Sequence, residues 1–300
     1  MTIRIDRQVA NARNGAVPVR FQTARRLGKI LAANPPAMFG LILAVCYLLI
    51  AIGAPQLAPY PYDKMGAGPV LEPPSRHFPF GTDEFGRDVF SRVLLGSRIS
   101  LRVGVLVVAI AGTVGSVVGL ISGFWGGWVD EGMMRITDIF LAVPGLVLAL
   151  TVATALGPAL ENAIIGVAAV QWTHYARLMR SGVLAERTKE YVVAAEATGV
   201  PSLRMLWRHI LPNSYSAVMV QATFDFGLSI LLAAGLSFIG AGAQPPLPEW
   251  GAMIAAGRQY VQVAWWIATF PGLAIFGAVL AFNLLGDTLR DTLDPRLRKG

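Results

Sequence analysis

This chain has little of what soluble enzymes use for chemistry. Its 300 residues include one cysteine and three histidines, and 14% of them are charged, whereas a soluble domain has about 25%. The single cysteine, Cys46, permits no internal disulfide bond, and three histidines offer few ligands for a metal centre. The sequence has no G-x-x-x-x-G-K-[ST] phosphate loop and no Ser/His/Asp or Cys/His arrangement. It therefore argues against an ATPase of that type and against an intramembrane enzyme.

The chain consists largely of apolar residues. They make up 54% of it, and its mean hydropathy is +0.56. Six apolar runs are near the roughly 20 residues needed to cross a bilayer. They lie at residues 37–58, 99–123, 133–156, 160–180, 214–240 and 264–286. We therefore predict an all-α integral membrane protein with six spans that contact lipid. A stand-alone channel or secondary transporter would be expected to repeat polar residues within its spans, and these spans do not.

Basic residues gather at the two ends of the chain. They are Arg4, Arg7, Arg13, Arg20, Arg25, Arg26 and Lys29, then Arg290, Arg296, Arg298 and Lys299. Nucleic-acid binding also uses basic tails, but these tails flank apolar runs, and the positive-inside rule accounts for them more simply. Both termini are predicted to be cytoplasmic, and no nucleic-acid partner is expected. The first 36 residues are too long and polar for a signal peptide, so the first apolar run is interpreted as a retained anchor.

These spans divide the chain into predicted segments. An N-terminal cytoplasmic tail (1–36) precedes the anchor (37–58), an extracytoplasmic segment (59–98), a membrane core (99–287) and a C-terminal cytoplasmic tail (288–300). Starting inside, six spans place residues 181–213 in the cytoplasm. Segment 59–98 has five basic residues and five acidic ones. Because these charges offset one another, we expect this segment to be folded.

Small residues and prolines mark the spans. Gly115, Gly119 and Gly123 recur every four residues and so share one helical face, which permits close approach of another helix. That helix could belong to a second subunit or to the same chain, and the sequence leaves both open. Pro144 and Pro271 interrupt the third and sixth spans and are predicted to kink them.

Few charged residues fall within the spans. Arg135 and Asp138 are three residues apart and are expected to pair on one helical face. Asp225, in the fifth span, is expected to face protein or a wet cavity, because a carboxylate at that depth is costly in lipid. It is either a buried hydrogen-bond acceptor or part of a path that favours cationic groups. His174 and Tyr175 are expected to be interfacial anchors.

One polar segment between two spans is more informative than any other. It is Glu190–Asn213, EYVVAAEATGVPSLRMLWRHILPN. A small-residue pair, Ala194-Ala195, a glycine at 199 and a Leu211-Pro212 stop are typical of two short helices folded into a knob. Such a knob could dock into a partner at the membrane surface, and the alternative is an ordinary loop of amphipathic helices. Gly199 is expected to have a positive φ.

The spacing of these residues resembles the coupling loop of importer-type ABC permeases. That pattern is Glu-Ala-Ala, three residues, Gly, nine residues, Ile, any residue and Leu-Pro. The positions that match are Ala194, Ala195, Gly199, Leu211 and Pro212. Val193 stands in place of the glutamate, and His209 stands in place of the isoleucine.

Three further segments resemble the C-type permease subunit of dipeptide, oligopeptide and nickel ABC importers. They are FGTDEFGRDVFSRVLLGSRISL (80–101), LSFIGAGAQPPLPEWG (236–251) and FPGLAIFGAVLAFNLLGDTLRDTLDPR (270–296). With the knob, they cover most of the chain from about residue 35. The resemblance implies a six-helix type I ABC importer permease fold with cytoplasmic coupling helices, in a bacterial inner membrane. It implies transport of di- or oligopeptides, with nickel or another small solute as the alternative.

The resemblance also implies partners. These are a second homologous permease, two ATPase subunits that bind ATP and Mg, and an extracytoplasmic solute-binding protein. This chain would then hold no cofactor and perform no catalysis. The residues implied in coupling to the ATPases belong to a coupling loop at 189–212 and are Ala194, Ala195, Glu196, Gly199, Arg204, Leu211 and Pro212. Asp225 is the candidate for the translocation path. Glu196 and Arg204 are expected to lie on exposed helices.

The loop before the last span is stiff. Its sequence, QPPLPEW, spans Gln244–Trp250 and contains three prolines, which restrict their own backbone and that of the preceding residues. Trp250 has an amphipathic ring that suits the outer interface. The loop is predicted either to cap the path and touch the binding protein, or only to connect two spans.

Overall fold

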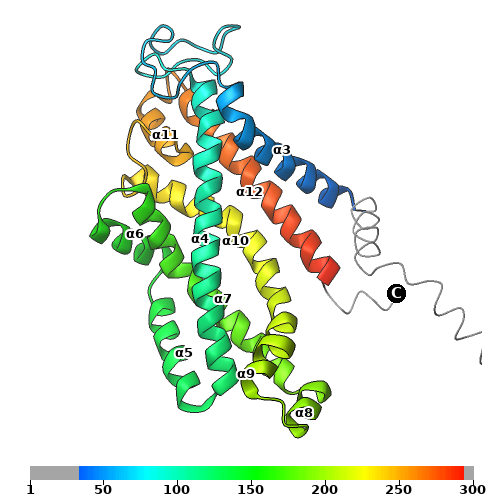
Figure 1. Ribbon diagram of the computed structural model, residues 1–300. Helices are drawn as coiled ribbons and strands as arrows, with labels where there is room; N and C mark the ends of the chain where they lie inside the picture. Colours follow the sequence, from blue (N-terminus) through cyan, green and yellow to red (C-terminus); the bar gives the residue numbers. More distant parts are fainter. Residues whose placement is uncertain (1–33, 294–300) are drawn as a thin grey trace, which may run out of the picture.

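The longest helix, α4 (Val89–Trp125), runs through the molecule, and the other helices are arranged around it (Figure 1). The structure is a computed structural model that describes residues 34–293. Most of the predicted tail residues therefore lie outside the described part. Asp88 caps α4 by accepting a hydrogen bond from the Ser91 amide at 2.9 Å. The helix begins ten residues before the predicted span, because its first turns bury polar side chains against protein.

The glycine face of α4 packs against α7 (Leu160–Arg187) of the same chain. A Cβ added at Gly115 would meet the Trp172 carbonyl oxygen, and one added at Gly119 would meet that of Ala176. The two backbones are thus too close for any side chain between them. This contact answers the question that the sequence left open, because the facing helix is part of this subunit.

The third predicted span is two helices. α5 (Gly127–Ala142) and α6 (Gly145–Leu156) meet at an angle of 92°. Val143, which precedes Pro144, has an extended backbone, and Pro144 lacks the N–H that would continue the helix. The expectation of a continuous span with a kink was therefore wrong, since the chain turns sharply here.

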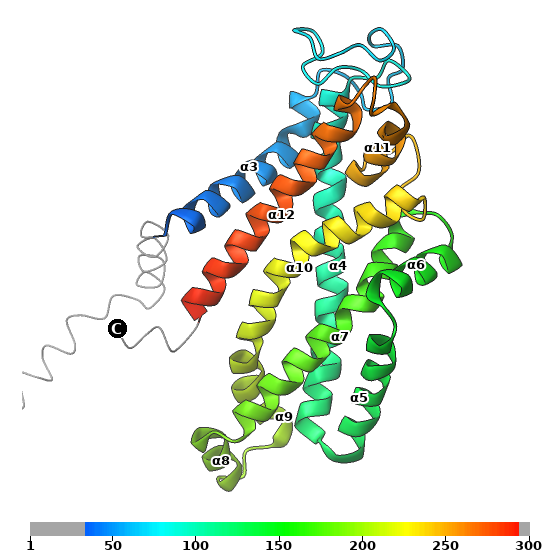
Figure 2. The same cartoon turned by 180° about the vertical axis from the view of Figure 1, so that it is seen from behind.

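Three helices form the other half of the bundle. They are α3 (Pro35–Leu57), α10 (Leu211–Ile239) and α12 (Trp266–Leu293). α3 lies along α12, which in turn packs against α10 (Figure 2). The Tyr47 hydroxyl on α3 donates a hydrogen bond to the Ala274 carbonyl at 2.9 Å. Within residues 34–293, four helices are long and apolar enough to cross a membrane, or five spans if α5 and α6 form one.

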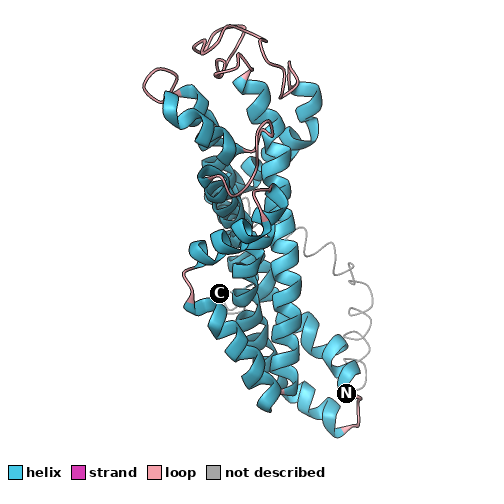
Figure 3. Cartoon of the chain, turned by 90° about the vertical axis from the view of Figure 1, so that its left-hand side faces the viewer, coloured by secondary structure: helices cyan, strands magenta, loops and turns pink. Residues whose placement is uncertain are grey.

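The connections gather at opposite ends of the bundle. α8 (Glu190–Ala197) and α9 (Ser202–Met205) lie at one end, followed by a π-helical turn, Leu206–Ile210. Loop 58–88 and α11 (Trp250–Gly257) lie at the other, where a short 3-10 turn, Arg258–Tyr260, follows α11 (Figure 3). The two ends are therefore joined by the long helices.

The predicted ion pair within α5 does not form. Arg135 instead contacts Glu131, one turn earlier, at 2.5 Å, and Asp138 accepts from Arg177 of α7 at 2.6 Å. Asp138 faces the neighbouring helix, so its partner comes from there. All four side chains are more than half exposed, and such pairs contribute about 0–1 kcal/mol each.

Candidate functional site

Residues 189–212, here called the knob, form two short helices around a glycine turn. Gly199 has a φ of +78°, which confirms the predicted positive value. Its amide donates to the Glu196 carbonyl at 2.9 Å, and the Val200 amide donates to that of Ala195 at 3.1 Å. These two bonds close α8 in a Schellman motif, which favours glycine at this position. No atom lies within 4 Å of the place a Cβ would take, so the backbone conformation alone requires glycine.

The inner side of the knob is anchored in the core of the bundle. Val192, Met205, Leu206 and Ile210 are at most 5% exposed and join the core cluster formed by α4 and α7. The knob is therefore packed firmly against the helices to which it is attached.

The outer side of the knob is apolar as well as charged. Four large side chains are at least 40% exposed, and these are Tyr191, Val193, Leu203 and Trp207. The structure also exposes Ala194, Glu196, Gly199, Arg204 and Pro212, and half-buries Ala195 and Leu211. Exposed apolar side chains rimmed by charge suit a protein interface. The predicted coupling residues thus lie together on one small module.

A polar clamp at the base of the knob escaped the sequence analysis. The buried Glu186 carboxylate accepts from Lys189 Nζ and Tyr191 Oη, each at 2.5 Å. Asn213 Nδ2 donates to Tyr191 Oη at 3.2 Å and to the His209 carbonyl at 2.6 Å. Burial, followed by the bond to Glu186, raises the pKa of Tyr191 to about 12. The clamp ties the ends of α7, α8 and α10 together. Only the three-residue spacing of Glu186 and Lys189 could have indicated it.

A cavity of about 390 Å³ lies beside the knob. α8 and α9 form one wall, and the last turn of α4 forms another, with Phe124 and Trp125. Arg187 also lines it and donates to the Gly123 carbonyl at 3.1 Å. This bond fastens the end of α7 to the end of α4.

Asp225 lies in the middle of the bundle, between α10 and α7. Its side chain is 4% exposed, so it faces protein as expected, and Oδ1 accepts from Gln221 Nε2 at 3.0 Å. The Tyr175 hydroxyl faces it from α7. Tyr175 itself is completely buried, which corrects its predicted interfacial place, whereas His174 is exposed. Tyr175 points inward because it packs against the glycine face of α4.

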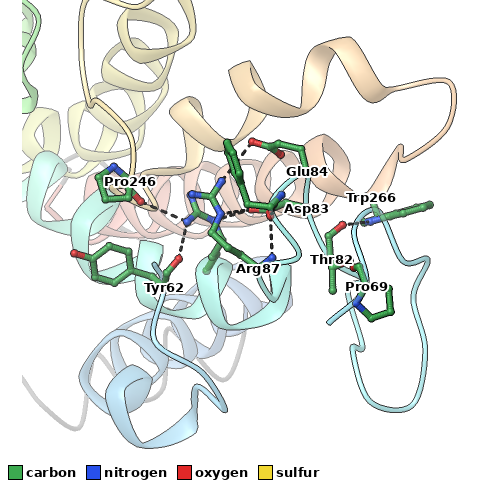
Figure 4. Close-up of polar contacts among 10 residues, drawn as sticks. Tyr62, Pro69, Thr82, Asp83, Glu84, Arg87, Pro246 and Trp266 are labelled. Atoms are coloured by element: carbon green, nitrogen blue, oxygen red, sulfur yellow. Dashed lines mark hydrogen bonds and ion pairs between the residues drawn. The ribbon is translucent and has the colours of Figure 1, made fainter. Parts of the chain in front are cut away.

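The opposite end of the molecule is closed by a folded cap, loop 58–88. Arg87 Nε contacts Asp83 Oδ2 at 2.6 Å, and Glu84 lies beside them (Figure 4). Trp266 Nε1 donates to the Thr82 carbonyl at 3.0 Å. These buried bonds confirm that the offset charges belong to a folded segment.

Loop 240–249 is fastened to this cap. Arg92 Nη1 donates to the carbonyl oxygens of Tyr62 at 2.6 Å and Pro246 at 3.4 Å. Trp250 is 1% exposed, and its Nε1 donates to the Val93 carbonyl at 3.0 Å, so its predicted place at the lipid interface was wrong. Its ring is covered because α11 packs against α10 and α12 and so places Trp250 against α4. The loop exposes Gly240 and residues 244–247 and buries the rest.

Glu249 begins α11 from a buried position. Its carboxylate accepts from the amides of Gly251 at 3.0 Å and Ala252 at 2.9 Å. Burial raises the pKa of this carboxyl group, and the two amides oppose that shift. Glu249 is therefore an N-cap that holds α11, and its side chain is not available at the surface.

These features describe a multi-pass helical membrane protein with a knob at one end and a folded cap at the other. Residues 115–299 match the family model described as binding-protein-dependent transport system inner membrane component. Residues 22–74 match the N-terminal TM domain of oligopeptide transport permease C. The chain belongs to this family of inner membrane transport components, the permease subunits of ABC transporters.

Relatives and a solved structure agree with this assignment. The dipeptide transport system permease protein DppC of Alkalihalophilus pseudofirmus is 45% identical over 91% of this chain and 90% of its own. A probable D,D-dipeptide transport system permease of Escherichia coli is 46% identical over 92% and 93%. A glutathione transport system permease of Pectobacterium atrosepticum is 42% identical over 91% and 90%. A chain of the inward-facing MetNI methionine ABC transporter covers 65% of this chain and 95% of its own, with a TM-score of 0.50 and 18% identity. The fold is that of a type I ABC importer permease.

Proposed function

We propose that this chain is one permease subunit of an ATP-driven importer of di- and oligopeptides in a bacterial inner membrane. The observation that carries the proposal is the knob, a hydrogen-bonded module with exposed apolar side chains, in a chain whose relatives are named as dipeptide permeases. Glutathione is itself a peptide, so the relative named for it also favours peptides over nickel. Both termini and the knob face the cytoplasm in this proposal.

The knob acts as a lever. It docks on one of two partner ATPase subunits, which bind ATP and Mg, and their closure moves it together with α7 and α10. The polar clamp supports this transfer, because it joins the knob to both helices. A second homologous permease completes the path, and an extracytoplasmic binding protein delivers peptide to the cap. This chain supplies neither catalysis nor a cofactor.

Two measurements test this function: co-purification of the chain with an ATPase, and uptake of dipeptide by the purified complex. The chain is expressed with its genomic neighbours, and the tagged complex is isolated from membranes. We expect an ATPase to co-purify and labelled dipeptide to enter proteoliposomes only with ATP and binding protein. A chain that purifies without an ATPase, and moves solute down a gradient, would instead be a channel or secondary transporter.

Charge reversal on the knob tests its rim. We expect Glu196→Lys and Arg204→Glu to lower dipeptide uptake by less than about fivefold, because exposed ion pairs contribute about 0–1 kcal/mol. Uptake and dipeptide-stimulated ATP hydrolysis measure the effect, and Glu161→Lys, an exposed charge at the opposite end of α7 from the knob, is the control. A complete loss of coupling in either knob variant would contradict a rim position.

Cysteine crosslinking tests whether loop 240–249 touches the binding protein. We expect Pro246→Cys and Leu247→Cys, in a Cys46→Ala background, to crosslink to it during turnover, because both residues are exposed. Position 249 is unsuitable, since Glu249 is buried. Crosslinks are measured by gel shift. Labelling from outside without any crosslink would leave the loop as a connector between α10 and α12.

A further inference from the structure

An open groove runs along the surfaces of α7 and α10. Two adjoining cavities of about 320 and 480 Å³ form it, and Leu178 and Gln221 line both. Sites for small molecules are typically about 300–1,000 Å³. The other polar side chains that line the groove are His174, Arg177, Ser181, Ser216 and Arg290. It therefore has the size and the polar lining that a small zwitterionic solute requires.

A buried carboxylate lies directly behind one wall of this groove. Gln221, Asp225 and Ser229 follow one another at four-residue spacing and so share one face of α10. Gln221 reaches Asp225 Oδ1, but Asp225 Oδ2 accepts no hydrogen bond from any described residue. Asp225 lies about 20 Å along α10 from Pro212, because each residue of an α-helix adds about 1.5 Å.

The surroundings of this carboxylate are also incompletely bonded. Gln171 accepts from Ser229 Oγ at 3.0 Å, but its own Nε2 has no partner among the described residues, and the Tyr175 hydroxyl faces Asp225 without a hydrogen bond of normal geometry. Three of the seven buried side-chain atoms that lack a partner among the described residues thus lie in this one cluster. Buried polar groups are normally satisfied. A cluster with several free valences next to a groove is suited to a ligand.

We propose that Asp225 receives the ammonium group of the transported peptide, and that Gln221 is the side chain displaced when it arrives. An ammonium group has three donors and can satisfy both carboxylate oxygens. It also places a positive charge beside the carboxylate, which the neutral amide of Gln221 cannot do. Arg177 at the groove is already paired with Asp138, and the ionisable groups of α7 near the carboxylate are Tyr175 and His174. The inference rests on the proposed function and names the part of the substrate that this chain recognises.

The first experiment compares two substrates in the complete reconstituted transporter. We expect Asp225→Asn to lower uptake of a dipeptide with a free amino terminus at least tenfold and uptake of its N-acetyl form less than twofold. Because the binding protein is unchanged, a change in the ratio of the two uptakes belongs to this chain. Glu161→Gln removes an exposed carboxylate from α7 and is the matched control. An equal fall for both peptides would assign Asp225 a purely structural role.

The second experiment requires no transport. Gln221→Cys is made in the Cys46→Ala background of the whole complex and is labelled with a cationic and with an anionic methanethiosulfonate reagent. The labelling rate of each reagent is divided by the rate at which that reagent labels a free thiol in solution. We expect the cation to react at least fivefold faster, and Asp225→Asn to bring the ratio close to one. Equal rates before that change would overturn the proposal. A preserved ratio without any peptide uptake would refute the proposed function and leave the cation site standing.

Discussion

Gly199→Val is expected to lower dipeptide uptake at least about tenfold while leaving membrane insertion intact. The φ of Gly199 is +78°. A residue other than glycine in this left-handed region costs about 1–3 kcal/mol, and the cost is highest for a β-branched residue such as valine. Because nothing lies within 4 Å of the Cβ position, the expected effect is not a clash. The turn rebuilds instead, and α8 loses its place relative to α10. Uptake at equal protein level in the membrane measures the effect.

Two variants separate this explanation from a general effect of valine. Gly199→Asn is expected to retain most uptake, because asparagine tolerates left-handed backbone. Gly132→Val adds the same side chain in open space on α5, where the backbone is helical, and is expected to be almost neutral. Normal uptake by Gly199→Val at a normal protein level would refute the role assigned to the knob.

Gly119→Ala is expected to cause a large loss of stability from a single methyl group. That Cβ would lie 2.9 Å from the Arg180 amide nitrogen and 2.9 Å from Met179 Cβ, and nearer still to the Ala176 carbonyl oxygen. These are mainly backbone atoms, so α4 and α7 would have to separate. Overpacking of this kind costs about 1–3 kcal/mol, occasionally more. The change would also displace Arg180, which binds Asp130 through two bonds of 2.5 and 2.6 Å.

The thermal stability of the purified protein measures this effect. Gly112→Ala is the matched control on the same helix, because its Cβ would be 3.8 Å from the Tyr175 ring, an ordinary contact. We expect the control to unfold at a temperature close to that of the unchanged protein and Gly119→Ala to unfold several degrees lower. Equal stability of the two variants would mean that α4 and α7 are not in close contact.

Features that depend on neighbouring residues were predictable. The knob and its glycine turn follow from a local pattern, since the sign of φ at Gly199 is a property of that turn alone. The apolar helices follow from composition, because a helix in lipid satisfies its own backbone. The break at Pro144 was placed correctly, but its size of 92° was not, since the direction taken by α6 depends on what α6 packs against.

Features that depend on a partner far along the chain were not predictable from the sequence. Arg135 and Asp138 were paired by spacing, whereas each found a better-placed partner, one of them on another helix. Trp250 has the chemistry of an interfacial residue, but the packing of α11 places it against α4, where it is covered. The Tyr191 clamp joins residues 22 positions apart, and no local pattern marks such a contact.

By itself, then, the sequence determined that the chain is built of apolar helices, where the knob turns, and that Asp225 faces protein. Each of these depends on short-range sterics or on the cost of placing a polar group in lipid. Only the tertiary structure decided that the glycine face of α4 meets α7, and that Asp225 lies behind Gln221 beside a groove. The physical reason is that a helical face determines only the shape and polarity that its neighbour must have. Several helices of this chain have them, so the face alone does not identify which helix packs against it.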